Sequence, residues 1–350
     1  MIATADKLTA TRCSTYRRCR KQHYYRYELG LTKSLEAHYF RFGRVFHHGV
    51  ELWNNGMDAQ KAIQTATEVY DVCPDAIELY KWQIERETVA NLLAGYFWQY
   101  QNDDIKYLTN EQAFEYPLIN PETGAASRTF VLAGKMDAIA QMPDTRLALM
   151  ERKTTVDDID PNGKYWLRLR ADGQISQYVL AARQLGYNVH VIYDVARKPS
   201  IKPRAVPLLD DAGCKIVLDR TGTRIFKKDC TPRQTASTKD GFVLQTRPET
   251  PEEYGTRLLT DIGERPDFYF QRREIPRLED ELEEFQLELW QQGKEIMESR
   301  RYGRWFRDVG KFTCPFCEYE ELCLNNITVD ADRPPVGFYI LDDVHPELAV

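Results

Sequence analysis

Two acidic residues and a lysine lie on two consecutive segments whose residues favour β-strands. Asp137 ends the run G-K-M-D in the first segment, and Glu151 and Lys153 form an E-x-K in the second. Side chains alternate along a strand, so Glu151 and Lys153 share one face, and a hairpin would bring Asp137 alongside them. Such charges are costly inside a sheet unless something binds them. Asp137 and Glu151 can ligate Mg²⁺ or Mn²⁺, while Lys153 can orient a water or stabilise charge on a phosphate.

An E-x-K is by itself a weak signal, because it arises often by chance on helix surfaces. In this chain it occurs once. The only D-x-K, from Asp104 to Lys106, follows a predicted helix and has no carboxylate-bearing strand before it. The strand context therefore favours the motif that contains Glu151.

A histidine on a predicted helix is a candidate third ligand. Gly43, His47 and Glu51 follow one another at intervals of four residues and so lie on one helix face. A glycine inside a helix lowers stability, which favours a position that something approaches closely. His47 can offer an imidazole to a metal. His48 lies next to it, however, and a single helix histidine is more often structural, so the pattern leaves the choice open.

Gln174 and Tyr178 form a Q-x-x-x-Y pair on the segment after the strands. The pattern predicts a helix over residues 174–185 that ends at Gly186, followed by a buried strand over residues 189–195. Residues four apart share a helix face, so both side chains point the same way. They can pack against the core, or they can hydrogen-bond a nucleic-acid backbone or base.

Hydrophobic periodicity indicates helices before these strands. Apolar residues at spacings near three and four in the first hundred residues are typical of helices. The turn residues P-D-T at 143–145 predict a hairpin between the strands on either side of them. The expected helices cover residues 36–53, 58–70 and 76–101, and the expected strands cover residues 111–119, 130–140 and 146–155.

The segment 198–250 has the least regular pattern. Five prolines interrupt it, and we interpret it as an insertion or loop with a small hairpin around residues 219–222. An acidic amphipathic helix follows it. Its apolar positions are Leu278, Leu282, Phe285 and Leu289. We find no internal repeat and no G-x-x-x-x-G-K-[ST] motif, which excludes a P-loop motor.

The composition is that of an ordinary globular protein. The chain has 350 residues, of which 43% are hydrophobic and 29% are charged, which excludes collagen-like and wholly disordered chains. No apolar run approaches the roughly 18–20 residues that span a bilayer. The N-terminus lacks the apolar core of a secretory signal, so we expect a cytoplasmic protein without a membrane partner.

The charge is unevenly distributed. The formal net charge is −6, yet residues 12–44 contain nine Lys and Arg against two Glu, a net charge of +7, so the rest of the chain sums to −13. Tyrosines are interleaved with these basic residues. Basic and aromatic side chains together suit phosphates and stacked bases. The alternative is a solvated helix face whose tyrosines pack inward.

The cysteines suit a metal site better than disulfides. In a reducing compartment, clustered cysteines indicate metal binding or catalysis. Cys314, Cys317 and Cys323 form a C-x2-C-x5-C cluster, which is one thiolate short of a four-cysteine site. Two further cysteines, Cys13 and Cys19, lie near the other end of the chain.

The motifs, taken in order, resemble those of a known nuclease family. G-x-x-x-H, G-x-x-D, E-x-K and Q-x-x-x-Y resemble the PD-(D/E)XK nuclease superfamily. Within it the similarity is to the RecB-type exonuclease branch, which includes the AddB nuclease domain and the CRISPR-associated RecB-like exonucleases. The run S-T-Y-R-R-C-R-K-Q-H-Y-Y at 14–25 is similar to the opening cysteine segment of that branch. The motifs span residues 13–323, and although each is degenerate, their order is specific.

The resemblance implies roles for the residues of the site. It implies His47, Asp137 and Glu151 as ligands of Mg²⁺ or Mn²⁺, and Lys153 as a catalytic residue acting with the two carboxylates. It implies that Gln174 and Tyr178 form an auxiliary motif on the substrate side.

The resemblance also implies a fourth cysteine ligand. Branch members with iron–sulfur clusters place one cysteine before the nuclease core and three after it. Cys19 would then join Cys314, Cys317 and Cys323 around a [4Fe–4S] cluster, with zinc as the alternative. The family often has proline after the first cysteine, whereas here Arg20 follows Cys19. Cys13 therefore remains an alternative fourth ligand.

The implied fold is of the α/β (α+β) class. It has a restriction-endonuclease-like core with a central mixed sheet flanked by helices. We divide the chain into five parts. These are a mainly helical N-terminal part (1–110), the nuclease core (111–197), an insertion (198–250), a C-terminal helix with the cysteine cluster (251–331) and a tail (332–350).

The leading functional hypothesis is a metal-dependent DNA exonuclease that acts on single strands or DNA ends. It would work as a homo-oligomer or with a recombination, repair or CRISPR partner. One alternative is a DNA-binding or end-processing scaffold that acts through a partner on a nuclease fold. Another is a structural metal-binding module without a nucleic-acid role. The paired carboxylates and lysine favour the enzyme, because a scaffold has no need to retain buried charges.

Overall fold

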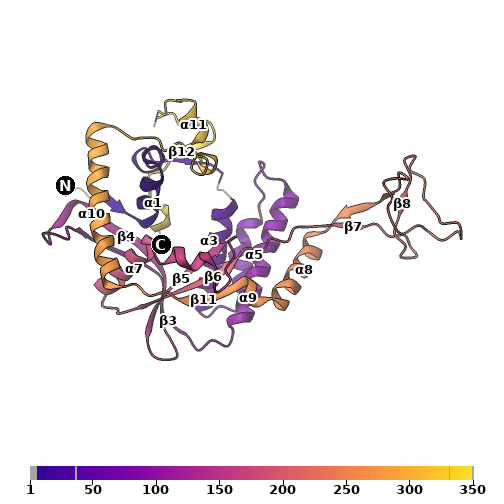
Figure 1. Ribbon diagram of the computed structural model, residues 1–350, viewed down its shortest axis with the longest axis horizontal. Coiled ribbons are helices and arrows are strands. Elements are labelled where there is room, and N and C mark those ends of the chain that lie inside the picture. The colour runs from indigo at the N-terminus through magenta and orange to yellow at the C-terminus, as the bar shows by residue number, and fades with distance from the viewer. Residues whose placement is uncertain (1–5, 36–37, 331, 349–350) are drawn as a thin grey trace.

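The computed structural model describes residues 6–35, 38–330 and 332–348. A mixed six-stranded sheet lies at the centre, helices cover both of its faces, and a thin arm projects from one end (Figure 1). The predicted fold class, a central mixed sheet flanked by helices, is confirmed. In the described part of the chain, no helix is both long and apolar enough to cross a lipid bilayer.

The sheet is organised around its longest strand, β4. On one edge β4 pairs with antiparallel β3, and on the other edge it pairs first with parallel β1 and then with antiparallel β5. β6 lies parallel to β5, and β11 closes the sheet antiparallel to β6. The strands are β1 (Asp6–Leu8), β3 (Lys106–Ile119), β4 (Ala126–Gln141), β5 (Leu147–Thr155), β6 (His190–Arg197) and β11 (Phe270–Glu274).

The predicted hairpin joins β4 to β5. Met142 N–H donates to the Arg146 carbonyl at 2.9 Å, and Thr145 has a φ of 71° in the turn. The ladder pairs Ala138 with Met150, so the next position in register sets Asp137 opposite Glu151. The parallel pair β5–β6 requires a crossover connection. The helices α6 (Lys164–Leu169) and α7 (Gly173–Gln184) provide it.

Four helices form an apolar layer against one face of the sheet. The side chains that meet there include Phe46, Leu93, Tyr96 and Ile262. The predicted helices of this region are present, although residues 36 and 37, where the first was expected to begin, lie outside the described residues. The four helices are α3 (His38–Asn54), α4 (Ala59–Thr67), α5 (Leu79–Tyr100) and α8 (Pro251–Glu264).

The opposite face is covered by α7 and by the long helix α10 (Glu279–Tyr302). Phe285 and Leu289 of α10 pack on Phe130 of β4. The prediction that Leu278 belongs to this apolar face is wrong, because it precedes the first turn as the N-cap residue and is 55% exposed. The remaining helical turns are η2 (Glu68–Tyr70), α9 (Pro266–Tyr269), η3 (Cys314–Phe316) and η4 (Pro346–Leu348).

The beginning and the end of the described chain pack together as a cap. Tyr25 and Leu31 share a small core with Tyr319 and Leu322, and the Tyr319 hydroxyl donates to the Leu31 carbonyl at 2.6 Å. β2 pairs antiparallel with β12. The elements of the cap are α1 (Ala10–Arg18), α2 (Arg20–His23), the π-helical turn η1 (Tyr24–Glu28), β2 (Leu31–Lys33), α11 (Glu320–Leu324) and β12 (Phe338–Ile340).

The arm is a two-stranded stalk with a small tip. The stalk pairs β7 (Ala205–Pro207) with β10 (Thr246–Pro248), and the tip contains the short strands β8 (Val217–Leu218) and β9 (Val243–Leu244). Three hairpin turns with one hydrogen-bond pattern follow one another in the tip. They cover residues 210–214, 219–223 and 227–231. The predicted hairpin at 219–222 is therefore confirmed.

The expectation of no internal repeat is wrong for this tip. The run L-D-D-A-G-C-K-I-V at 209–217 is followed directly by L-D-R-T-G-T-R-I-F at 218–226. Gly213 and Gly222 occupy the same place in each turn, with φ of 76° and 84°. The repeat escapes the sequence pattern because only two full copies of nine residues are present.

Gly134, the glycine of the G-x-x-D run, is required by packing. A Cβ at this position would lie 2.6 Å from the Phe114 ring and 3.0 Å from Tyr178 of α7. We expect Gly134→Ala to destabilise the protein by about 1–3 kcal/mol through overpacking. Chemical denaturation monitored by circular dichroism measures this change.

Gly263 on α8 offers a matched control, because no atom lies within 4 Å of a Cβ placed there. Gly263→Ala should leave the free energy of unfolding unchanged or raise it by up to about 1 kcal/mol. Equal effects of the two substitutions would contradict the packing argument.

Candidate metal centre

Asp137 lies at the point where the ladder between β4 and β5 ends. Its side chain is buried, with the residue 8% exposed. The Arg152 backbone N–H donates to Oδ2 at 2.7 Å, and Oδ1 lies 3.6 Å from His47 Nδ1. Burial raises the pKa of Asp137, but His47 and Arg152 outweigh it, so the pKa is lowered overall. The structure thus holds an ionised carboxylate at the centre of the sheet.

Glu151 is more deeply buried, at 2% exposed. Lys153 Nζ lies 2.8 Å from Oε1, while Oε2 is buried without a hydrogen-bond partner in the described structure. Burial raises the pKa of Glu151 to about 7, although Lys153 acts in the opposite direction. An unpartnered carboxylate oxygen inside a protein is costly. A divalent cation fits this donor, since Mg²⁺ and Mn²⁺ prefer carboxylate oxygens.

Lys153 connects the carboxylates to helix α7. Its Nζ donates to Gln174 Oε1 at 2.7 Å, and Gln174 Nε2 donates to the Tyr178 hydroxyl at 2.9 Å. Asp172, which caps α7 by accepting from the Gln174 N–H, lies 3.6 Å from the same ammonium. Burial alone would lower the pKa of Lys153, but Glu151 and Asp172 outweigh it and raise the pKa. The Q-x-x-x-Y pair therefore lies in direct contact with the E-x-K.

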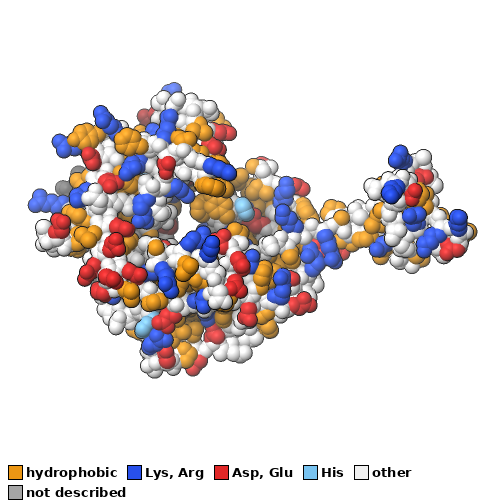
Figure 2. Space-filling model, in the orientation of Figure 1, with side chains coloured by type: hydrophobic (Ala, Val, Ile, Leu, Met, Phe, Trp, Pro, Cys, Tyr) orange, Lys and Arg blue, Asp and Glu red, His pale blue; other side chains and the backbone are white. Residues whose placement is uncertain are grey.

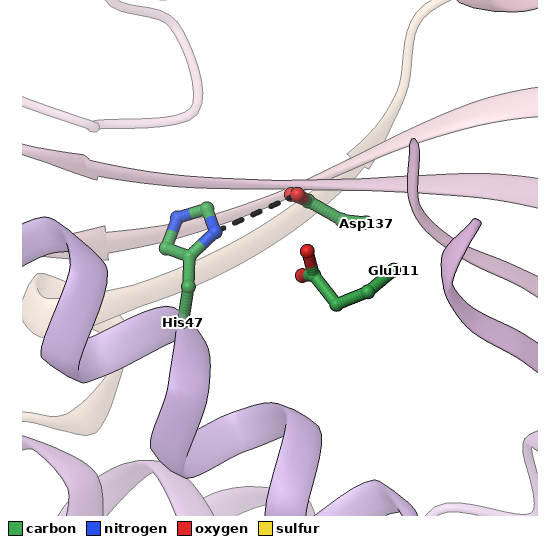
Figure 3. Close-up of side chains that lie close together, drawn as sticks. All are labelled: His47, Glu111 and Asp137. Atoms are coloured by element: carbon green, nitrogen blue, oxygen red, sulfur yellow. Dashed lines mark ion pairs between the residues drawn. The ribbon is translucent and has the colours of Figure 1, made fainter. Parts of the chain in front are cut away.

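The structure distinguishes between the two neighbouring histidines. His47 faces Asp137 (Figure 3), whereas His48 faces outward and pairs with Glu51 at 3.4 Å. Glu51 therefore does not join the site, although it was expected on the same helix face. Burial lowers the pKa of His47, but Asp137 raises it more strongly, so the pKa is raised overall. Packing leaves room for a side chain at Gly43, whose nearest neighbour would be Thr154 Oγ1 at 3.5 Å.

Glu111 on β3 also faces this site, and sequence analysis did not find it. One ligand atom each from His47, Glu111 and Asp137 lie within 4.8 Å of one another. Glu111 approaches the other two side chains from the neighbouring strand (Figure 3). The ladder pairs Gln112 with Met136, so Glu111 is set opposite Asp137. The signal that could have located it is the antiparallel register of β3 and β4, which no local motif encodes.

The backbone of Glu111 is strained. Its φ is 51°, in the left-handed region that non-glycine residues rarely occupy inside a strand. Burial raises the pKa of Glu111, and Asp137 adds to the effect, while Lys135 at 3.1 Å opposes it. Strain of this kind persists only where the surrounding structure imposes it, and it concentrates at functional sites.

A buried arginine supports the site from the other face of the sheet. Arg152 is 1% exposed, and its Nη1 donates to the Asp137 carbonyl at 3.3 Å. Asp194, on the same face, accepts from the Tyr96 hydroxyl at 2.5 Å and from Arg272 Nε at 2.8 Å. The middle residue of the E-x-K is thus a structural cation that sequence analysis did not identify.

The predicted cysteine ligands are brought to one place. One pocket in the cap is lined by Cys19, Cys314, Cys317 and Cys323. Their sulfur atoms do not come together within 4.8 Å as the metal-centre ligands do, as judged over the described residues. Cys13 lies elsewhere, in an apolar cluster with Leu8 and Tyr16, where burial raises the pKa of its thiol to about 11.

Two of the nine basic residues of the N-terminal segment are buried, whereas Arg17, Arg18, Lys33 and Arg44 are exposed. Arg12 is fully buried and donates to Asp6 Oδ1 at 2.7 Å, and Arg41 pairs with Glu85 at 2.8 Å. The tyrosines at 16, 25 and 27 are at most 7% exposed, so their rings pack inward. For these three residues the alternative interpretation, inward packing instead of base stacking, is the one that holds. Tyr39 and Phe40 differ, with 47% and 62% exposed.

Comparison with known protein families agrees with this geometry. Residues 7–324 match the family described as the PD-(D/E)XK nuclease superfamily, whose members use divalent metals. A comparison with curated proteins found no match. The matched range contains every residue of the metal centre and all four cysteines of the cap pocket. The chain therefore belongs to the PD-(D/E)XK nuclease superfamily.

Proposed function

We propose that this protein is a Mg²⁺- or Mn²⁺-dependent DNA exonuclease that acts on single strands or DNA ends. The observation that carries the proposal is that Asp137 lies opposite Glu151, which pairs with Lys153 and keeps one carboxylate oxygen without a partner within the described residues. His47 and Glu111 complete a set of nitrogen and oxygen donors around Asp137. A scaffold without catalysis would gain nothing from keeping these charges buried.

The proposed division of labour follows from the contacts. Asp137 and Glu151 would hold the cation together with His47 and Glu111. When bound, it would supply a nucleophilic water at neutral pH and charge stabilisation at the phosphate. Lys153, held by Glu151 and Gln174, presents a positive charge where negative charge develops on the phosphate oxygens. Gln174 in turn keeps this ammonium in place through its contact with Tyr178.

The surface has features that suit a nucleic acid. Figure 2 shows a hollow near the centre of this face, bordered by hydrophobic and basic side chains. Tyr39 and Phe40, exposed at the start of α3, offer rings on which bases can stack. These features support a single strand as the substrate.

The cap pocket supports a [4Fe–4S] cluster as a structural cofactor. The four cysteines line one pocket, although no three of their sulfur atoms lie within 4.8 Å of one another within the described residues. One cysteine before the nuclease core and three after it is the arrangement of the iron–sulfur nucleases that the chain resembles, and it favours a cluster over a single zinc ion. Because the pocket is lined by residues from both ends of the described chain, a metal bound there would hold the two parts of the cap together.

Removing either a proposed metal ligand or the lysine tests the assignment. We expect Asp137→Asn and Lys153→Met each to lower the rate of Mn²⁺-dependent DNA hydrolysis on the order of 10²–10³-fold, because each removes charge needed at the phosphate. Asp104→Asn and Lys106→Met are matched controls at exposed positions and should retain full activity. Full activity of the Asp137 or Lys153 variant would refute the proposal.

A closed circular single strand, which should resist an exonuclease, distinguishes exonuclease from endonuclease action.

Glu111 has a test of its own. We expect Glu111→Gln to weaken Mn²⁺ binding about ten-fold in isothermal titration calorimetry, because one anionic donor is lost. Glu115→Gln is the control on the same strand, since Glu115 pairs with Lys7 at 2.6 Å away from the site. Equal Mn²⁺ affinity of both variants would remove Glu111 from the ligand set.

The cysteines separate the cluster from zinc. Protein purified without oxygen should be brown, with absorbance at about 400 nm from iron–sulfur charge transfer, and Cys19→Ser should lose both the iron and the colour. Cys13→Ala should keep them, because Cys13 does not line the pocket. Colourless protein with one zinc per chain would overturn the cluster assignment, and loss of iron in the Cys13 variant would reassign the fourth ligand.

A further inference from the structure

The arm is fixed to the body of the protein at its base. Glu249, at the end of the stalk, is 2% exposed, and Arg257 Nη2 of α8 donates to its carboxylate at 2.7 Å. Arg204 N–H donates to the same carboxylate at 3.1 Å, and the Tyr80 hydroxyl of α5 donates to the Glu249 carbonyl at 2.7 Å. These bonds join the stalk to two helices, so the arm leaves the body in a defined direction (Figure 1).

The arm carries a charge opposite to that of the chain as a whole. Residues 198–248 contain eleven Lys and Arg against five Asp, a net charge of +6, within a chain of net charge −6. Basic side chains are visible over the stalk and the tip in Figure 2. Seven of the eleven cations of the arm are exposed, against four of the nine in the N-terminal segment. The arm is therefore a more accessible basic surface than that segment.

The acidic and basic residues of the arm differ in their contacts. Four of the five aspartates bind within their own turns, as when Asp219 Oδ1 accepts from Thr221 and Thr223, or pair with a cation, as Asp210 does with Arg224. Six basic side chains are exposed and, within the described residues, form no ion pair. They are Lys202, Lys215, Arg220, Lys227, Lys228 and Lys239.

The base of the arm adjoins the strand that carries the catalytic pair. Lys198 N–H donates to the Thr155 carbonyl at 2.7 Å, two residues after Lys153 on β5. Lys198 Nζ donates to the Tyr39 carbonyl at the start of α3, the helix of His47, at 3.2 Å. A nucleic acid that leaves the metal centre on this side would therefore meet the stalk.

We propose that the arm is a second DNA-contacting element, which grips the phosphate backbone of the duplex that lies outside the active site. The inference rests on the proposed nuclease function, since it assumes that DNA is the substrate. Exposed ammonium and guanidinium groups that have no protein partner bind phosphates and release counterions. Contacts of this kind position the DNA without reading its sequence.

A second copy of the chain is the competing occupant. Leu209, Phe226 and Val243 at the tip are 52–56% exposed and are suited to a protein contact. They are separate side chains on a tip whose unpaired charges, within the described residues, are mostly basic, and phosphate is the ligand that those charges fit. The experiment below gives a different result for each occupant.

The test reverses two charges at the far end of the arm. In the double variant Lys227→Glu, Lys228→Glu, we expect affinity for a labelled duplex of about 30 base pairs with a single-stranded end to fall about five- to ten-fold. Between about 50 and 200 mM salt, the slope of log affinity against log salt should become shallower by about 2. Hydrolysis of a single strand of about six nucleotides, which has no duplex for the arm to grip, should be unchanged.

The matched control is Lys61→Glu, Lys294→Glu, which reverses two exposed lysines on α4 and α10 outside the arm. It should bind the duplex as wild type does. Equal affinity and equal salt slope for the arm variant and the control would overturn the proposal. So would a change in sedimenting mass of the arm variant without a change in DNA affinity, because the arm would then contact a second copy. Loss of duplex binding in the arm variant, with a wild-type protein that does not cut DNA, would support the arm and refute the nuclease.

Discussion

The structure depends on the burial of two carboxylates at one crossing of the sheet. Asp137 and Glu151 lie opposite each other where β4 and β5 part, and both are almost inaccessible to solvent. Two buried negative charges repel each other and lose hydration. The surrounding structure offsets this with a cation on each face of β5, Lys153 on one side and Arg152 on the other. One carboxylate oxygen of Glu151 stays buried without a hydrogen-bond partner within the described residues.

The helices on the two faces serve this arrangement in different ways. α7 is capped by Asp172 and brings Gln174 to the ammonium of Lys153, and it can approach β4 closely because Gly134 has no side chain. α3 brings His47 from another direction to the opposite oxygen of Asp137. The second carboxylate beside Asp137 comes from a strained residue, Glu111. The site is assembled from the strands β3, β4 and β5 and from the helices α3 and α7. Such regular elements hold side chains rigidly, which is what preorganised charge stabilisation requires.

The distribution of charge changes meaning once the fold is known. The +7 segment near the N-terminus looked like the nucleic-acid surface, yet Arg12 and Arg41 are buried in ion pairs and three of its tyrosines are core residues. The irregular segment 198–250, which showed no functional signal in sequence, forms a projecting arm with exposed and unpaired cations. The net charge of a segment does not show whether it can bind nucleic acid, because a polyanion meets only the charges that are accessible to solvent.

Sequence determined those parts of the protein that depend on neighbours along the chain. Alternation placed Glu151 and Lys153 on one strand face, and a short turn brought Asp137 to them, since a tight hairpin leaves little freedom of register. The helix period put Gln174 and Tyr178 together. Helix periodicity left His47 and His48 open and only the family resemblance pointed to His47; tertiary structure sets His47 against Asp137, because the packing angle of the helix selects which of the two faces the sheet. It alone revealed Glu111 and the role of Arg152, because these depend on strand register and on side chains from distant parts of the chain, which no local periodicity encodes.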